Sequence, residues 1–159
     1  MLNQLYCDGA AKNNPGPAGC GAVLYLTMPE SKVEMVQSLG MGTNNEAEYC
    51  GLLLGMKEAH ERYKLDKLVI RTDSALVVNQ VNGQWKCKAN NLKPFLKAAQ
   101  ALLKKHQPGW TLEWIPRDQN AVADRLANKA VRTDCVFPDT TPRKFLDSFI
   151  VTQTAERKD

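Results

Sequence analysis

The sequence predicts an α/β domain with a mixed five-stranded sheet, three antiparallel strands plus two parallel ones, flanked by helices. Three short strands separated only by turns come first, and they predict an antiparallel meander. Two strands that each lead into a helix follow, and such units predict strands that join the sheet in parallel. A length of 159 residues and an apolar fraction of 43% suit one domain with a hydrophobic core.

The first three strands are expected over residues 2–8, 21–27 and 32–39. The first of them ends on Asp8, and the Gly-, Asn- and Pro-rich residues 9–19 form the turn of a hairpin. An Asp flanked by apolar residues costs free energy unless a hydrogen-bond network, an arginine or a metal ion compensates it. Asp8 is therefore the first candidate for a site residue.

A helix is expected over residues 43–63, because residues 43–46 (Thr-Asn-Asn-Glu) fit a capping box and apolar residues follow at helical spacing. Glu46 is the expected partner of the Thr43 cap. Glu48 lies in phase with the apolar side of this helix. Two interpretations of Glu48 stay open: a functional acid that points inward, or a partly exposed acid that the helix dipole stabilises.

The second half of the chain predicts a strand over residues 68–72, helices over 75–81 and 90–105, a strand over 110–115 and a helix over 121–131. Asp73 follows the first of these strands. It is interpreted either as the N-cap of the next helix or as a site residue, because ligands bind at the carboxyl ends of strands in open α/β sheets. Asp124 lies near the beginning of the last helix, among small apolar residues.

Two units are expected along the chain: a folded domain over residues 1–133 and a C-terminal tail over residues 134–159 that is partly ordered at most. The tail carries an apolar patch. We expect the patch to pack on the domain, and the alternative is a surface for a partner. Its residues are Phe145, Leu146, Phe149, Ile150 and Val151.

The composition restricts the classes of function. A net charge of +4 permits nucleic-acid binding without requiring it. The five cysteines have no CxxC spacing, which favours reduced, mostly buried thiols over a zinc site or a disulfide framework. The sequence has no N-terminal secretion signal and no apolar run long enough to cross a membrane. We therefore expect a cytoplasmic monomer with no membrane partner.

Four acids come from a strand, a helix start, a strand end and a helix start, and all four can converge at one end of the sheet. They are Asp8, Glu48, Asp73 and Asp124. Four carboxylates together repel one another unless they take up protons or a cation intervenes. Oxygen-rich acidic sites suit Mg²⁺ or Mn²⁺. Two such ions roughly 4 Å apart can activate a water molecule and stabilise the leaving oxygen of a phosphodiester.

Four motifs contain these acids, in an order that covers roughly residues 1–132, and each lies at an expected strand or helix boundary. They are Asp8-Gly9 with Asn14-Pro15-Gly16-Pro17 and Gly19-Cys20-Gly21-Ala22, Thr43-Asn44-Asn45 with Glu48, Thr72-Asp73-Ser74, and Asn120 with Ala123-Asp124-Arg125-Leu126-Ala127. With these motifs the sequence resembles the type-1 ribonuclease H family.

The resemblance implies an endonuclease that hydrolyses the RNA strand of RNA–DNA hybrids and leaves 5′-phosphate and 3′-hydroxyl ends. It implies that the four acids are catalytic and bind two Mg²⁺ ions, with Mn²⁺ as a substitute. Asp8 would bridge both ions. Glu48 and Asp73 would complete the site that orients attack, and Asp124 would hold the ion on the nucleophile side.

The resemblance also implies a set of substrate-binding residues. Asn14, Asn44 and Asn45 match positions that contact the minor groove and the ribose 2′-hydroxyls, which distinguish RNA from DNA. Thr43 matches a position that binds a DNA phosphate, and Trp85 resembles an aromatic that lines the channel for the DNA strand. The remaining members of the set are Ser74, Lys86, Lys88, Arg117 and Asn120.

The sequence departs from the family pattern in two places. Many members insert a helix and a basic loop after the Trp region, whereas here Trp85 leads almost directly into the next helix. The grip on the substrate is then expected to be weaker or to come from Lys86, Lys88 and Lys93, or from another domain or partner. Many members also have a His in the loop before the last helix, and here Arg117 is the expected local substitute, as a phosphate-binding cation.

Other functions fit parts of the pattern. A 3′–5′ exonuclease of similar fold usually has Asp-x-Glu on the first strand, and the segment from Asp8 to Ala10 lacks the second acid. A non-catalytic binding module is opposed by the intact acids. A nuclease of relaxed specificity would also cut double-stranded RNA. A transposase-like or reverse-transcriptase-associated domain shares the fold.

Overall fold

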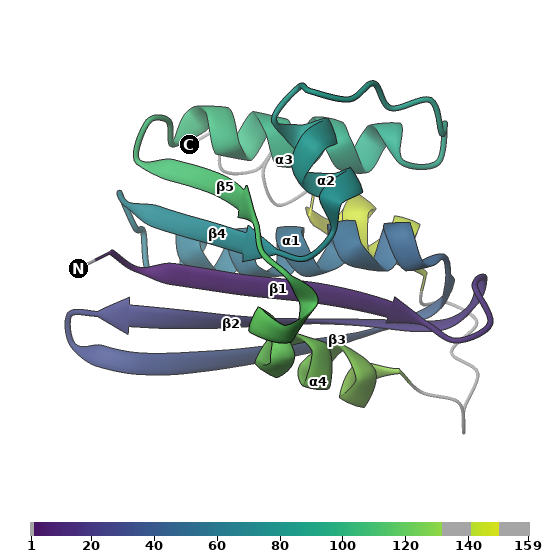
Figure 1. Ribbon diagram of the computed structural model, residues 1–159, viewed down its shortest axis with the longest axis horizontal. Coiled ribbons are helices and arrows are strands. Elements are labelled where there is room, and N and C mark those ends of the chain that lie inside the picture. Colours follow the sequence, from purple (N-terminus) through teal and green to yellow (C-terminus); the bar gives the residue numbers. More distant parts are fainter. Residues whose placement is uncertain (1, 132–140, 150–159) are drawn as a thin grey trace.

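The computed structural model describes residues 2–131 and 141–149, and it has a five-stranded sheet at its centre (Figure 1). The strands are β1 (Gln4–Ala11), β2 (Gly16–Thr27), β3 (Glu30–Gly42), β4 (Leu68–Thr72) and β5 (Trp110–Trp114). Their order in the sheet is β3-β2-β1-β4-β5. The pairs β1–β2 and β2–β3 are antiparallel, and the pairs β1–β4 and β4–β5 are parallel. The predicted mixed sheet is confirmed.

The helices lie on both faces of this sheet. They are α1 (Asn44–Glu61), α2 (Ala75–Val81), α3 (Lys93–Lys105) and α4 (Ala121–Ala130), with a short 3₁₀ turn η1 (Arg117–Gln119) before α4. Figure 1 shows α1 behind the sheet and α4 in front of it. Both helices pack on β1 and β2, so their first turns approach the same end of the sheet from opposite sides.

Several boundaries differ from those predicted. β1 continues past Asp8 to Ala11 and β2 begins at Gly16, because the pairs Gly9–Cys20 and Ala10–Gly19 extend the ladder through the small residues. Asp8 therefore lies inside a strand and not at its end. α3 begins at Lys93, three residues later than expected, because Pro94 is accommodated only in the first turn of a helix.

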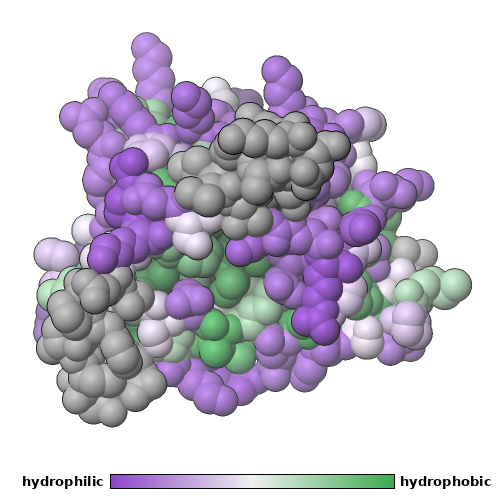
Figure 2. Space-filling view, turned by 180° about the vertical axis from the view of Figure 1, so that it is seen from behind, coloured by the Kyte–Doolittle hydropathy of each residue, from purple (hydrophilic) through white to green (hydrophobic). Residues whose placement is uncertain are grey.

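The chain also forms a helix over residues 142–149. Leu146 and Phe149 are buried in the main hydrophobic core, and the Cys50 thiol donates to the carbonyl oxygen of Pro142 over 3.8 Å. The expected packing is confirmed for Leu146 and Phe149, whereas Ile150 and Val151 lie outside the described residues. Figure 2 shows the face opposite to that of Figure 1, where hydrophilic residues cover most of the surface around a smaller hydrophobic region near the centre.

Four cysteines of the described ranges are free thiols: Cys7, Cys20 and Cys50 are buried, and Cys87 is half-buried. This agrees with the reduced thiols expected from their spacing, while Cys135 lies outside those ranges. None of the helices in the described ranges has both the length and the hydrophobicity that a membrane crossing requires.

Gly51 allows α1 to approach β1 closely. A Cβ atom at Gly51 would lie 2.4 Å from the carbonyl oxygen of Asp8, a distance that a backbone oxygen cannot relieve by moving alone. One turn later, a Cβ atom at Gly55 would lie 2.6 Å from a methyl group of Leu5, whose side chain can shift. The start of α1 is thus set directly against Asp8 by the absence of a side chain at residue 51.

We predict that Gly51→Ala lowers the free energy of unfolding by about 1–3 kcal/mol, because the new methyl group overpacks against backbone. Gly55→Ala is the matched control: both changes gain helix propensity of about 1 kcal/mol, but only Gly51→Ala meets backbone. Urea unfolding followed by circular dichroism measures both. Equal stability of the two variants would contradict this account of the α1–β1 contact.

Candidate active site

Three of the four candidate acids meet at one end of the sheet. Oxygen atoms of Asp8, Glu48 and Asp73 all lie within 4.8 Å of one another. Asp8 comes from the middle of β1 and is 5% exposed, Glu48 comes from the first turns of α1, and Asp73 comes directly after β4. Residues that are far apart in the sequence are therefore combined into one acidic cluster.

The beginning of α1 fixes Glu48 in this cluster. The Thr43 hydroxyl accepts from the Glu46 backbone N–H, and the Glu46 carboxylate accepts from the Thr43 N–H, so the predicted capping box is confirmed. Glu48 Oε1 accepts from the backbone N–H of Gly9 over 2.9 Å. Glu48 thus points at β1, and of the two interpretations left open by the sequence the structure agrees with the inward one.

Asp73 is fixed by Asn120. The Asn120 Nδ2 donates to Asp73 Oδ1 over 3.1 Å and to the carbonyl oxygen of Cys7 over 2.9 Å. One amide therefore joins the middle of β1 and the end of β4 to the start of α4. The interpretation of Asp73 as a helix cap is wrong, because Ser74 caps α2 by accepting from the Val77 N–H.

Asn120 is more buried than expected for a residue that contacts the substrate. It is 1% exposed, and its side chain makes no cap hydrogen bond to α4, although it occupies the N-cap position. Within the part of the chain that the structure describes, its Oδ1 accepts no hydrogen bond. This burial favours support of Asp73 and Cys7 over the direct substrate contact that the resemblance implies.

Asp124 lies in the first turn of α4, next to the cluster and outside the group of three. Its carboxylate accepts from Asn128 Nδ2 over 3.2 Å, and Arg117 Nη2 lies 4.0 Å from the same oxygen. A hydrogen bond with Asp124 contributes to the raised pKa of Asp8, which places the two carboxyl groups side by side.

Burial changes the protonation of the cluster. The pKa of Asp8 is raised from 3.8 to about 7, chiefly by burial and also by the charge of Asp73 and the hydrogen bond with Asp124, against lowering contributions from Glu48 and the Gly9 N–H. The pKa of Glu48 is also raised, first by burial and then by the hydrogen bond and charge of Asp8. Without a cation, burial therefore favours the protonated forms of Asp8 and Glu48.

The donor set of the cluster fits a hard divalent cation. Carboxylate oxygens are the ligands that Mg²⁺ and Mn²⁺ prefer, and acids that repel one another are stabilised when a cation replaces their protons. Asp8, Glu48 and Asp73 can share one ion, and Asp124 adjoins Asp8 on the side of α4. The cluster is thus suited to bind metal ions where Asp8, Glu48 and Asp73 meet.

Two of the expected substrate-binding residues contact each other. Asn14 Oδ1 accepts from the Asn44 N–H over 2.9 Å, and Asn44 Oδ1 accepts from the Ala11 N–H over 2.8 Å. Both side chains are exposed, as is Asn45, while Thr43 is half-buried by its capping role. The turn between β1 and β2 is thereby tied to the beginning of α1.

The other expected contacts lie on two separate segments. Trp85, which is 51% exposed, and the exposed Lys86 and Lys88 belong to the loop between α2 and α3 (Figure 1). Arg117 belongs to η1, and its side chain is 82% exposed beside Asp124. The structure therefore brings Arg117 to the acids, whereas the loop forms its own exposed surface.

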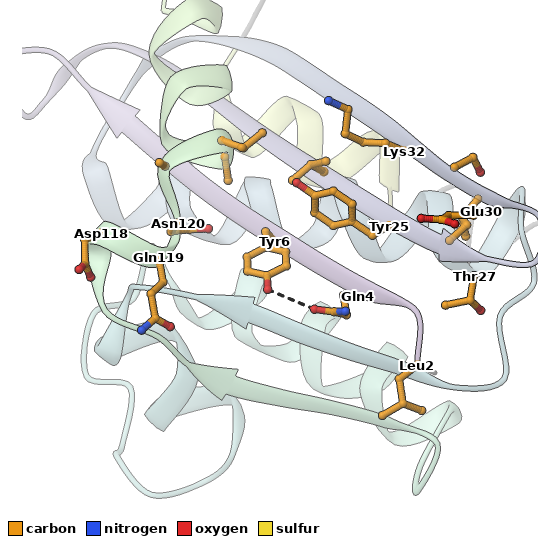
Figure 3. Close-up of a pocket in the computed structure, with 16 residues that line it drawn as sticks. Leu2, Gln4, Tyr6, Tyr25, Thr27, Glu30, Lys32, Asp118, Gln119 and Asn120 are labelled. Atoms are coloured by element: carbon orange, nitrogen blue, oxygen red, sulfur yellow. Dashed lines mark hydrogen bonds between the residues drawn. The ribbon is translucent and has the colours of Figure 1, made fainter.

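A groove of about 830 Å³ runs along the sheet from the start of α4. Figure 3 shows Asp118, Gln119 and Asn120 at one end of it, with Tyr6 and Tyr25 farther along. Because Asn120 lines the groove and also binds Asp73, the groove begins next to the acidic cluster. No local sequence pattern indicated it, since its walls come from strands and a turn that are distant in the sequence.

Trp114 also contacts a residue of the cluster, which the sequence did not predict. It was expected only as a strand residue, but its indole Nε1 donates to the carbonyl oxygen of Asp73 over 3.1 Å. The ring is 51% exposed, at the end of the strand that forms one edge of the sheet. No signal in the sequence indicated this contact, since the strand expected over residues 110–115 placed Trp114 inside it and not at its end.

The chain is similar to characterised proteins over most of its length. A family model described as reverse transcriptase-like matches residues 6–130. Bifunctional protein Rv2228c of Mycobacterium tuberculosis is 44% identical over 129 residues, which are 80% of this chain and 35% of that protein. A protein named ribonuclease H from Polynucleobacter asymbioticus is 32% identical over 142 residues, which cover 80% of this chain and 88% of that one.

A solved structure has the same architecture. The crystal structure of LC11-RNase H1 in complex with an RNA/DNA hybrid matches with a TM-score of 0.73 at 32% identity, over 81% of this chain and 96% of that chain. The residues that the family model matches, 6–130, include all four of the candidate acids. The chain spans only about a third of the length of the mycobacterial curated relatives it matches.

We predict that the metal-free protein loses stability as the pH rises from about 4 to about 7. The pKa of Asp8 is raised from 3.8 to about 7 by folding, so its contribution to stability is full below the lower value and is lost as the pH rises through the upper one. Mg²⁺ should therefore raise the melting temperature more at pH 8 than at pH 5.5, because protons no longer compete.

Thermal unfolding with and without MgCl₂ at the two pH values measures this dependence. Asp8→Asn is the control, since it removes both the titrating group and a ligand. A Mg²⁺-induced shift that is equal at both pH values, or that persists in Asp8→Asn, would show that the cation binds elsewhere.

Proposed function

Because the chain belongs to the type-1 ribonuclease H family, we propose that it is a metal-dependent endonuclease that hydrolyses the RNA strand of RNA–DNA hybrids. The observation that carries this proposal is the cluster of Asp8, Glu48 and Asp73 within 4.8 Å, with Asp124 beside it. A relative with these elements has been crystallised with an RNA/DNA hybrid. The proposal concerns this chain and not the whole of the mycobacterial relatives, since the match covers only 35% of their length.

Two Mg²⁺ ions, with Mn²⁺ as a substitute, would supply an activated water and stabilise the leaving oxygen, which leaves 5′-phosphate and 3′-hydroxyl ends. Asp8 is suited to the central position among the acids, because Glu48, Asp73 and Asp124 each influence its pKa. Glu48 and Asp73 would hold one side of the site and Asp124 the other. Asn120 and the Gly9 N–H keep these carboxylates in place.

Recognition of the hybrid would use the exposed residues around the cluster. Asn14, Asn44 and Asn45 would contact ribose 2′-hydroxyls, and the mutual hydrogen bonds of Asn14 and Asn44 favour a preformed contact surface. Thr43 and Ser74 retain hydroxyl donors, because each cap uses the oxygen only as an acceptor.

The DNA strand would lie along the loop after α2. Trp85 offers an exposed aromatic surface there, and Lys86 and Lys88 are exposed for phosphate contacts. We propose in addition that the protein acts as a monomer in the cytoplasm, in line with its modest net charge and its free thiols.

We predict internal cuts confined to the RNA of an RNA–DNA hybrid in the presence of Mg²⁺ or Mn²⁺, and none with Asp8→Asn. Labelled RNA–DNA, RNA–RNA and DNA–DNA duplexes of the same sequence test this. Cutting of RNA–RNA as well would mark a nuclease of relaxed specificity. Binding of the hybrid without cutting of any duplex would leave a non-catalytic binding module and overturn the proposal.

A second prediction concerns Arg117, whose guanidinium lies 4.0 Å from Asp124 in the place of the missing loop histidine. Arg117→Ala should lower the turnover of the hybrid by roughly fivefold, because an exposed charge contact is worth about 1 kcal/mol. Arg125→Ala is the matched control: Arg125 is another exposed arginine, and it pairs with Glu34, which is not one of the four acids, over 3.2 Å. A loss with Arg117→Ala as complete as with Asp8→Asn would contradict this ranking.

A further inference from the structure

Asp73 occupies a position that the sheet alone does not fix. β4 ends at Thr72, and the Ile115 N–H donates to the Thr72 carbonyl oxygen over 3.0 Å as the last backbone contact of this edge. α2 begins after its Ser74 cap. Asp73 thus lies in the link between a strand and a helix, where its backbone needs another partner to be held in one orientation.

Trp114 supplies that partner. Its indole Nε1 donates to the Asp73 carbonyl oxygen over 3.1 Å, while Asn120 holds the carboxylate of the same residue over 3.1 Å. An indole N–H is a donor only and sits on a rigid ring, so it defines a direction as well as a distance. Figure 1 shows the chain leaving β5 beside the end of β4 before it turns toward α4.

The other tryptophan of β5 provides a contrast. Trp110, at the first position of the strand, is 1% exposed and donates its indole N–H to the Leu65 carbonyl oxygen over 2.9 Å. Trp114, at the last position, makes the same kind of bond with half of its surface exposed. Core packing accounts for Trp110, but it does not account for a large ring left half in solvent beside an acid of the cluster.

We propose that Trp114 is a positioning residue, which acts through the backbone of Asp73 to hold its carboxylate toward Asp8 and Glu48. The expected effect of Trp114 on cleavage rests on the proposed function. Its expected effect on Mg²⁺ binding depends only on the acidic cluster. Trp114 does not contact the metal ions in this account, and it contributes no donor to the substrate.

The test compares Trp114→Phe with Trp110→Phe in the full chain. Each change removes one indole-to-carbonyl hydrogen bond from β5 and keeps an aromatic ring. We expect Trp114→Phe to weaken Mg²⁺ binding, measured by calorimetry, by about fivefold, in keeping with the loss of one net hydrogen bond. Its kcat for the hybrid should fall by a similar factor with KM unchanged. Trp110→Phe should lower the melting temperature and leave the Mg²⁺ affinity of the folded protein unchanged.

Three other results of these measurements would overturn the proposal. Unchanged Mg²⁺ affinity in a folded Trp114→Phe protein would overturn the proposal, as would an equal loss in Trp110→Phe. A rise in KM alone, seen in Trp114→Ala and not in Trp114→Phe, would identify a ring that contacts substrate and would likewise overturn it. If the wild type cuts no hybrid, the proposed function fails, whereas the calorimetric comparison still decides the role of Trp114.

Discussion

The structure depends on one electrostatic constraint, the close approach of three carboxyl groups in a partly buried place. Charged, they would repel one another in surroundings that screen charge poorly. Neutral hydrogen-bond donors stabilise two of these carboxylates: the Gly9 N–H donates to Glu48 and the Asn120 amide donates to Asp73. Burial also raises the pKa of both Asp8 and Glu48, which favours their uncharged forms when no cation is bound. The cluster can therefore exist without a cation and still exchange its protons for one.

The same constraint explains how the layers are arranged. Glu48 and Asp124 lie in the first turns of two helices, α1 and α4, that cover opposite faces of the sheet. Both helices must therefore pack closely on the sheet near Asp8. Gly51 brings α1 against the backbone of Asp8, and Gly21 does the same for α4, since a Cβ atom there would lie 2.5 Å from that of Leu126. Asn120 then ties β1, β4 and α4 together. Close backbone packing thus places Asp8 and Glu48, whereas side-chain hydrogen bonds hold Asp73 in the link after β4.

Sequence reasoning predicted those features whose causes are local. The capping box at Thr43 and Glu46, the inward phase of Glu48 and the order of strands and helices all follow from residues close together in the chain. It did not predict those features that depend on partners distant in the sequence. β1 and β2 continue through residues of low strand propensity because each supplies the other's hydrogen bonds. The buried amide of Asn120 and the indole of Trp114 were likewise missed as supports, since their partners Asp73 and Cys7 are 41 or more positions away.

The proposed chemistry and the proposed recognition are carried by different kinds of contact. The acids are held by hydrogen bonds within the protein, which are partly buried for Gly9 and Asn120 and exposed for Trp114. The residues proposed to contact nucleic acid lie on a turn, at helix starts and on a loop, and most of them are exposed, so substitutions there disturb packing least. The short loop around Trp85 can therefore vary in length and charge without moving the carboxylates. A nuclease built in this way can change its choice of duplex by changes on its surface while the metal site stays as it is.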